Sequence, residues 1–150
     1  MYNDDTNFPI TVTNELITKD IFSDKPQIIP NTIPKYPRVG LVNGLYATGA
    51  GLGGITVIET FEIPSDNKFT LELTGQQGDV MKESMEVAST VAWNMLPLRT
   101  QNTLLKNWKH GNMGIHIHCP EGSTPKDGPS AGQAITLALI SLYTNICVSP

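Results

Sequence analysis

Residues 115–143 read IHIHCPEGSTPKDGPSAGQAITLALISLY and contain two clear structural signals, one on either side of a polar loop. Residues 115–119 alternate as a half-buried strand does, with both histidines on one side, and Pro120 ends the run. Residues 131–143 are apolar on nearly every face, which predicts a buried helix. The loop between them ends at Ser130, directly before this helix.

Further strands and one amphipathic helix are expected upstream. Apolar or alternating runs predict strands at residues 39–45, 55–63 and 69–73, and in the second run Glu59 interrupts an apolar face. Asp79 is a good N-cap for a helix with apolar residues at near-helical spacing up to residue 96, and Pro97 bounds it. Residues 99–114 are expected to form a loop. Strands and helices without regular βαβ alternation predict an α+β fold.

The chain of 150 residues fits one domain. We expect residues 1–37 to form its N-terminal edge, with a short helical or extended piece at residues 10–22 and then a segment punctuated by prolines. Residues 38–150 are expected to form the body of the domain.

Composition and charge exclude several classes of protein. The formal net charge is −4 and the ten basic residues are spread thinly, which argues against binding of nucleic acid. The acidic start does not have the succession of a secretory signal, and no apolar run is long enough to span a membrane. Cys119 and Cys147 are expected to be buried, reduced cysteines. We therefore expect an intracellular protein without membrane contacts.

Two motifs are better explained by structure than by ligand binding. The glycines of residues 49–54 satisfy G-x-G-x-x-G, but a strand follows where a dinucleotide site needs a helix, so a glycine-rich hairpin is expected. The chain also has no G-x-x-x-x-G-K-[ST] phosphate loop. His116 and His118 have a spacing that permits a metal ion but does not specify one, and we expect no metal site.

Two enzyme motifs around Ser130 lack their required context. Residues 128–132 match the G-x-S-x-G elbow of α/β-hydrolases, but the nearest strand is too far upstream, and no Asp, Glu or His follows Ser130. Residues 123–126 match S-x-x-K, which needs a helix that the neighbouring prolines and Gly128 disfavour.

Ser130 itself has two interpretations. It precedes a buried helix, so helix-start N–H groups lie beside its hydroxyl, and the flanking glycines could leave N–H groups free for an oxyanion hole. A serine in this place is also a common helix cap. The residues alone leave a nucleophile and a cap equally open.

A family resemblance favours the nucleophile. Residues 73–84, LTGQQGDVMKES, and residues 115–132, IHIHCPEGSTPKDGPSAG, resemble the proteolytic domain of ATP-dependent Lon proteases, and the resemblance extends from about residue 10 to the last residue. It implies that Ser130 attacks the peptide carbonyl with a lysine as general base. It also implies that Asp127, with Gly128 and Pro129, belongs to a loop whose conformation helps set active and inactive states, and that Glu59 borders the site.

The chain departs from the family pattern in two places. The family's lysine lies a few dozen residues beyond the serine, on a later helix, whereas no lysine follows Lys126 here, and Lys126 is not the family's base. We therefore expect residues 1–150 alone to be inactive, and the uncovered helix at residues 131–143 to favour association. Residues 44–48 read GLYAT where the family has Gly-Leu-Ala-Trp-Thr, so Ala47 stands where tryptophan is expected.

The resemblance implies a serine endopeptidase that hydrolyses unfolded or damaged proteins through a Ser-Lys dyad. It implies no cofactor in this chain, ATP and Mg²⁺ in an ATPase domain of the full-length protein, and subunits in a ring, expected to be a hexamer. The expected compartments are the cytoplasm, the mitochondrial matrix or the peroxisome. A different kind of function is also consistent with the missing lysine: an inert Lon-like module that binds peptides or joins a ring.

Overall fold

The computed structural model describes residues 11–25, 32–47, 51, 53–67, 69–108, 111–120 and 127–149. The chain divides into two units, residues 1–30 and 31–150. In the first unit, Thr13 Oγ1 accepts a hydrogen bond from Leu16 N at 3.2 Å and caps α1 (Asn14–Leu16), and the π-helical turn η1 (Ile17–Ile21) follows. The N-terminal piece is therefore helical over residues 14–21. Residues 26–31 of the proline-punctuated segment lie outside the described residues.

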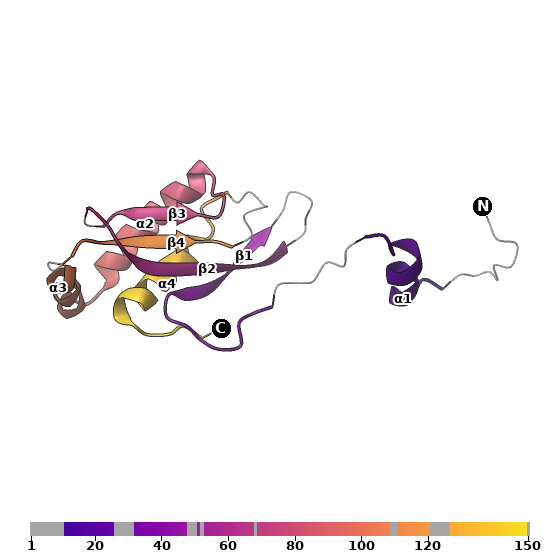
Figure 1. Cartoon of the computed structure of the whole chain (residues 1–150), viewed down its shortest axis with the longest axis horizontal. Coiled ribbons are helices and arrows are strands. Elements are labelled where there is room, and N and C mark those ends of the chain that lie inside the picture. Colours follow the sequence, from indigo (N-terminus) through magenta and orange to yellow (C-terminus); the bar gives the residue numbers. More distant parts are fainter. Residues whose placement is uncertain are drawn as a thin grey trace, which may run out of the picture. The chain divides into compact units, whose positions relative to one another are not determined.

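The second unit contains a sheet whose four strands have the order β1-β2-β4-β3 (Figure 1). The strands are β1 (Leu41–Ala47), β2 (Gly53–Pro64), β3 (Leu71–Thr74) and β4 (Met113–His118). β2 pairs antiparallel with both β1 and β4, whereas β3 and β4 are parallel. All four predicted strands are confirmed. β3 begins two residues later than predicted because Phe69 has φ 59°, outside the range of a strand.

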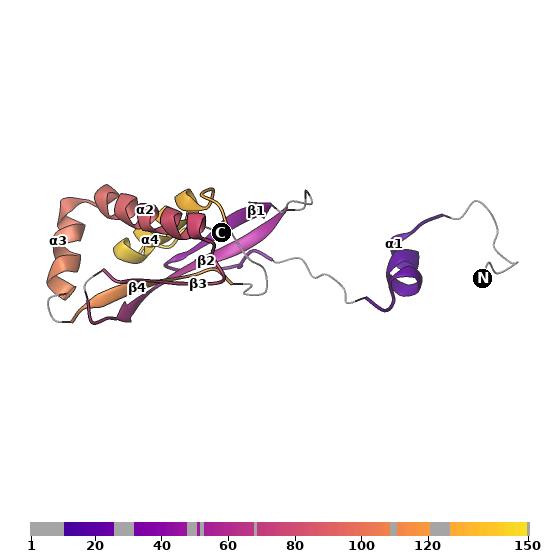
Figure 2. The ribbon, with the colours of Figure 1, turned by 90° about the horizontal axis from the view of Figure 1, so that it is seen from above.

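Two helices, α2 (Asp79–Met95) and α4 (Gly132–Thr144), cover one face of this sheet (Figure 2). Their apolar residues form one core with the helix-facing strand positions, and the large side chains with no exposed surface include Ile58, Met85, Ile117, Ile135 and Leu139. The mixed sheet with helices on one face confirms the α+β prediction. The predicted helix at residues 131–143 is confirmed, although Leu137 stays 43% exposed.

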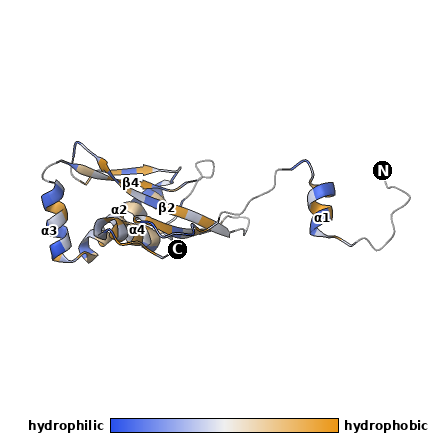
Figure 3. Cartoon of the chain, turned by 60° about the horizontal axis from the view of Figure 1, so that its bottom comes forward, coloured by the Kyte–Doolittle hydropathy of each residue, from blue (hydrophilic) through white to orange (hydrophobic). Residues whose placement is uncertain are grey.

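The prediction of a loop at residues 99–114 is wrong, because α3 (Leu98–Asn107) forms there. Thr100 N and Gln101 N donate to Pro97 O at the start of this helix. α3 buries only Leu104 within its length and Trp108 directly after it, and both hydrophilic and hydrophobic stretches lie along it (Figure 3). Most residues of α3 are polar, so its apolar stripe is much shorter than that of α2.

The apolar face of residues 55–63, which Glu59 interrupts, is not the face of β2 that packs in the core. Residues of β2 that are buried under the helices are Thr56, Ile58 and Thr60, and Thr60 Oγ1 donates to Gly40 O at 3.0 Å and lies 3.3 Å from Ala138 O of α4. Because successive side chains of a strand point to opposite faces, Glu59 and its apolar neighbours lie on the face away from α4. Thr60 can take a core position because backbone carbonyls lie within reach of its hydroxyl.

The two cysteines differ in exposure. Cys119 is buried as predicted, but Cys147 is exposed, so the prediction for Cys147 is wrong. Cys147 lies beyond the C-terminal end of α4, next to Val148, which packs against the core. No described helix is both long enough and apolar enough to cross a lipid bilayer.

Candidate functional site

The loop before α4 is anchored on the first turn of α2. Asp127 Oδ1 accepts hydrogen bonds from Met81 N and from Gly128 N, each at 2.9 Å. The predicted N-cap, Asp79, is instead the first helical residue, and the N-cap is Gly78, which has no side chain to cap with. Asp127 therefore caps α2 from a distant loop, where its negative charge also suits the positive end of the helix.

A second contact joins this loop to α2 three residues further on. Ser84 Oγ donates to Pro129 O at 3.3 Å, and Gly132 N donates to the same oxygen at 3.1 Å in the turn that leads into α4. Gly128 has φ 116°, a conformation that favours glycine. The predicted loop residues 127–130 thus lie together, held against α2.

Ser130 is exposed, and its hydroxyl has no hydrogen-bond partner among the described residues. The N-cap of α4 is Ala131, and no side chain caps this helix. The interpretation of Ser130 as a helix cap is therefore not supported. Within the described part of the chain, the backbone N–H groups of Ser130 and Ala131 also lack an acceptor. A hydroxyl and nearby N–H donors are the groups that acyl transfer needs.

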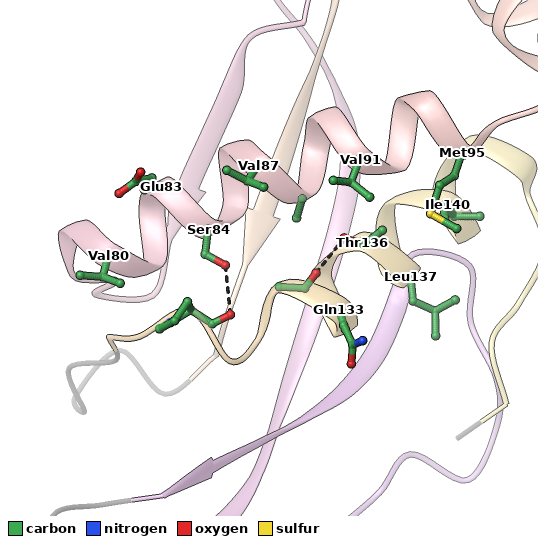
Figure 4. A pocket seen from close by; sticks show the side chains of 13 residues that line it. Val80, Glu83, Ser84, Val87, Val91, Met95, Gln133, Thr136, Leu137 and Ile140 are labelled. Carbon is green, nitrogen blue, oxygen red and sulfur yellow. Dashed lines mark hydrogen bonds between the residues drawn. The ribbon is translucent and has the colours of Figure 1, made fainter.

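A groove of about 860 Å³ opens beside this loop, between α2 and α4 (Figure 4). Figure 4 shows Ser84 pointing from α2 toward the loop, with Val87, Val91 and Met95 further along the same helix. Leu137 and Ile140 line the groove from α4. The groove is therefore polar where it meets the loop and apolar along the rest of its length.

Glu59 lies on the other face of the sheet. It pairs with His118 across β2 and β4, at the end of the sheet from which the chain leaves toward the loop. No hydrogen bond or ion pair joins Glu59 to the described loop residues 127–130. The structure thus places Glu59 at the same end of the sheet as the loop, without bringing it to Ser130.

The two histidines share one side of β4, as predicted, and Thr74 of β3 joins them. Thr74 Oγ1 lies 2.8 Å from His116 Nε2 and 2.7 Å from His118 Nδ1. Among the described residues, His, Cys, Asp and Glu side chains nowhere gather in a group of three or more that could hold a metal ion. The histidines connect the parallel pair of strands.

Several motifs fall partly or wholly outside the described residues. Of the glycine run, residues 49, 50 and 52 are not described, but β1 and β2 pair up to Ala47 and Gly53 and so flank a hairpin. A Cβ atom on Gly54 would lie 2.6 Å from Tyr46 Cζ, so the tyrosine ring lies over this glycine. Residues 123–126, the S-x-x-K match, lie outside the description. β4 ends at His118, far upstream of Ser130, so the serine does not sit on a strand-to-helix elbow.

Sequence reasoning did not identify Ser84 or Gly78 as site residues. A Cβ atom on Gly78 would lie 2.4 Å from Asp127 Cγ, so only glycine leaves room for the carboxylate. The one available signal was that both residues belong to the stretch 73–84 on which the family resemblance rests.

Comparisons with known proteins show the family of this chain. The family model described as "Lon protease (S16) C-terminal proteolytic domain" matches residues 11–150. A "Lon protease homolog" of Acanthamoeba polyphaga mimivirus is 40% identical over 146 residues, which cover 94% of this chain and 14% of that protein. A "Lon protease homolog, mitochondrial" of Drosophila melanogaster is 41% identical over 149 residues, which cover 92% of this chain and 14% of that protein.

A bacterial relative has a similar identity to this chain. The "Lon protease" of Acinetobacter baumannii is 42% identical over 113 residues, which cover 75% of this chain and 13% of that protein. The chain thus spans about one seventh of the length of these curated relatives. From the family match and these identities together, the chain belongs to the family of Lon protease (S16) C-terminal proteolytic domains.

Proposed function

We propose that Ser130 is the nucleophile of a serine-type endopeptidase site and that this chain supplies the nucleophile half of a Ser-Lys dyad. The main support is the exposed Ser130 hydroxyl, which has no partner among the described residues and lies just before the N-cap of α4 on a loop fixed to α2. A serine that served as the cap of α4 would direct its hydroxyl to a backbone N–H of the helix.

In this reaction the Ser130 oxygen forms a bond to the carbonyl carbon of the peptide, and the bond from that carbon to nitrogen breaks. A base takes the proton from the hydroxyl and returns it to the leaving amine. A lysine can act as this base only if its pKa is lowered by its surroundings. Since no lysine follows Lys126 in these residues, the proposed lysine comes from a segment outside them.

The nucleotide chemistry of the whole protein is not assigned to this chain. The glycine run leads into β2 and not into a helix, so its residues do not fit a phosphate-binding loop. We place ATP and Mg²⁺ in a separate ATPase domain of the full-length protein. The proposed setting is an intracellular ring, with six subunits expected, acting on unfolded or damaged polypeptides. Nucleic acid and membranes are not proposed as partners.

A second candidate function is an inert module that binds peptides or joins a ring without cutting. The exposed apolar groove between α2 and α4, which offers a surface to a polypeptide, is the observation that favours it. The two candidates differ in what happens when a lysine-bearing segment is restored.

A domain exchange separates these candidates. We expect no peptide hydrolysis by residues 1–150 alone at neutral pH, because Ser130 has no base in them. Placed in the matching position of the full-length Drosophila relative, the same residues should support hydrolysis that Ser130→Ala abolishes. An inactive but correctly assembled chimera would support the inert module. Hydrolysis by residues 1–150 alone that Ser130→Ala removes would refute the need for an external lysine.

A further inference from the structure

Ser84 lies where α2, the loop and the start of α4 meet. Its hydroxyl donates to Pro129 O at 3.3 Å, as Figure 4 shows from close by. A Cβ atom on Gly132 would lie 3.1 Å from Ser84 Oγ, so this hydroxyl also lies close to the first residue of α4. The side chain thus touches both the residue before Ser130 and the helix after it.

The direction of the Pro129 carbonyl fixes the direction of the Ser130 N–H. A trans peptide is planar, so the C=O of Pro129 and the N–H of Ser130 point in opposite directions. Ser84 and the N–H of Gly132 both donate to this carbonyl oxygen. With the carbonyl directed at α2, the Ser130 N–H points away from α2 and has no acceptor among the described residues.

Asp127, the other anchor of the loop, cannot orient the Ser130 N–H alone. Asp127 bonds to Met81 N and Gly128 N, which holds the loop at its start. Between this anchor and Ser130 lies Gly128, a residue with unusually free backbone rotation and here at φ 116°. The peptide unit that carries the Ser130 N–H therefore needs a hydrogen bond of its own. Gly132 N of α4 supplies one, and Ser84 of α2 supplies the other.

We propose that Ser84 is a positioning residue that orients the Pro129–Ser130 peptide so that the Ser130 N–H can donate to the oxyanion. This inference rests on the proposed function. Ser84 touches no reacting atom and acts through the Pro129 carbonyl. The contact is long for a hydroxyl donor, so its loss should have a moderate effect.

A peptide boronate tests the proposal in the chain as it stands. The Ser130 oxygen adds to the trigonal boron and gives a negatively charged tetrahedral adduct, the hydroxyl proton passes to the buffer, and a boron-bound oxygen lies where the oxyanion would lie. At a fixed pH the adduct therefore forms at equilibrium without a general base in the site. We expect Ser84→Ala to weaken boronate binding by about threefold to tenfold, the size of one ordinary hydrogen bond. Binding of the same peptide with a carboxamide in place of boron should not change. Both affinities can be followed by NMR titration.

Two further variants separate positioning from folding. Ser84→Thr keeps a hydroxyl and should restore the affinity for the boronate. Thr90→Ala removes an α2 hydroxyl that donates at 3.2 Å to Glu86 O of the same helix, so it should leave both affinities unchanged. Two results would refute the positioning role. One is an equal loss of affinity for the boronate and the carboxamide in Ser84→Ala, and the other is a failure of Ser84→Thr to restore the affinity for the boronate.

Ser130→Ala distinguishes this inference from the proposed function. If Ser130→Ala abolishes boronate binding but Ser84→Ala leaves it unchanged, the positioning role fails and the nucleophile stands. If the wild-type chain forms no adduct, or binds equally with Ser130→Ala, the assignment of Ser130 fails and the role of Ser84 fails with it.

Discussion

Gly78 shows how the lack of one side chain shapes the site. Its φ of −72° suits any residue, but a Cβ atom would lie 2.4 Å from Asp127 Cγ. We expect Gly78→Ala to displace the carboxylate that caps α2 and to lower the free energy of unfolding by about 1 kcal/mol, the usual value of a cap. Gly111→Ala is the matched control, because a Cβ atom there meets nothing within 4 Å. Equal urea midpoints for the two variants would contradict the capping role of Asp127.

Tyr143 gives the fold a dependence on alkaline pH. Burial raises the pKa of Tyr143 above its usual 10.0, the Glu62 carboxylate acts in the same direction, and a hydrogen bond with Ser89 opposes them. The folded chain then holds the phenolic proton more tightly than the unfolded chain. This contribution to stability is complete below about pH 10 and is lost as pH rises through the higher folded pKa.

Tyr143→Phe tests this dependence. Melting temperatures from pH 8 to pH 11 should fall more steeply for the wild type than for Tyr143→Phe above about pH 10. Parallel curves for the two proteins would show that Tyr143 ionises alike in the folded and unfolded states.

At the scale of elements, an aromatic cluster fixes α3 to the rest of the fold. Trp108 follows α3, is only 4% exposed, and packs edge-on against Phe69 and stacks on Trp93 with ring centroids 4.8 and 5.9 Å away. We expect Trp108→Ala to cost about 3–5 kcal/mol, as measured by circular dichroism during urea unfolding. Leu98→Ala at the 72% exposed start of α3 should cost less than about 0.5 kcal/mol. Similar losses for both would argue against the cluster as the anchor.

At the scale of the whole molecule, the groove between α2 and α4 exposes an apolar stripe. Val87, Val91 and Met95 of α2 are 56%, 42% and 65% exposed, and Leu137 faces them from α4. Exposed apolar surface of this kind favours association. We expect the chain to sediment as a mixture whose mean mass rises with concentration.

Charged substitutions in the stripe test its role in association. Val87→Glu with Met95→Lys should shift the population toward monomer, whereas Ile146→Lys, at a 66% exposed site outside the groove, should not. A wild-type chain that sediments as a single monomer with a cooperative melt would contradict this prediction.

The sequence by itself determined the strands, the two main helices and the place of Ser130 before α4. These elements have strong local signals: period-two alternation in β2 and β4, helical spacing in α2, and a continuous apolar run in α4. α3 was missed because most of its residues are polar, and its buried stripe consists of only Leu104 and the tryptophan four residues further on.

Tertiary structure alone decided which face of β2 enters the core and what holds the loop. The alternation in β2 shows that the strand has two different faces. The face that α4 covers is the buried one, even though two of its residues are threonines. Asp127 and its partner Met81, like Pro129 and its partner Ser84, lie far apart in the chain and meet only because α2 and α4 pack on one sheet. Local sequence patterns predict the helix or strand to which a residue belongs. Caps and contacts that a distant loop supplies depend on the tertiary fold, which brings that loop beside the helix.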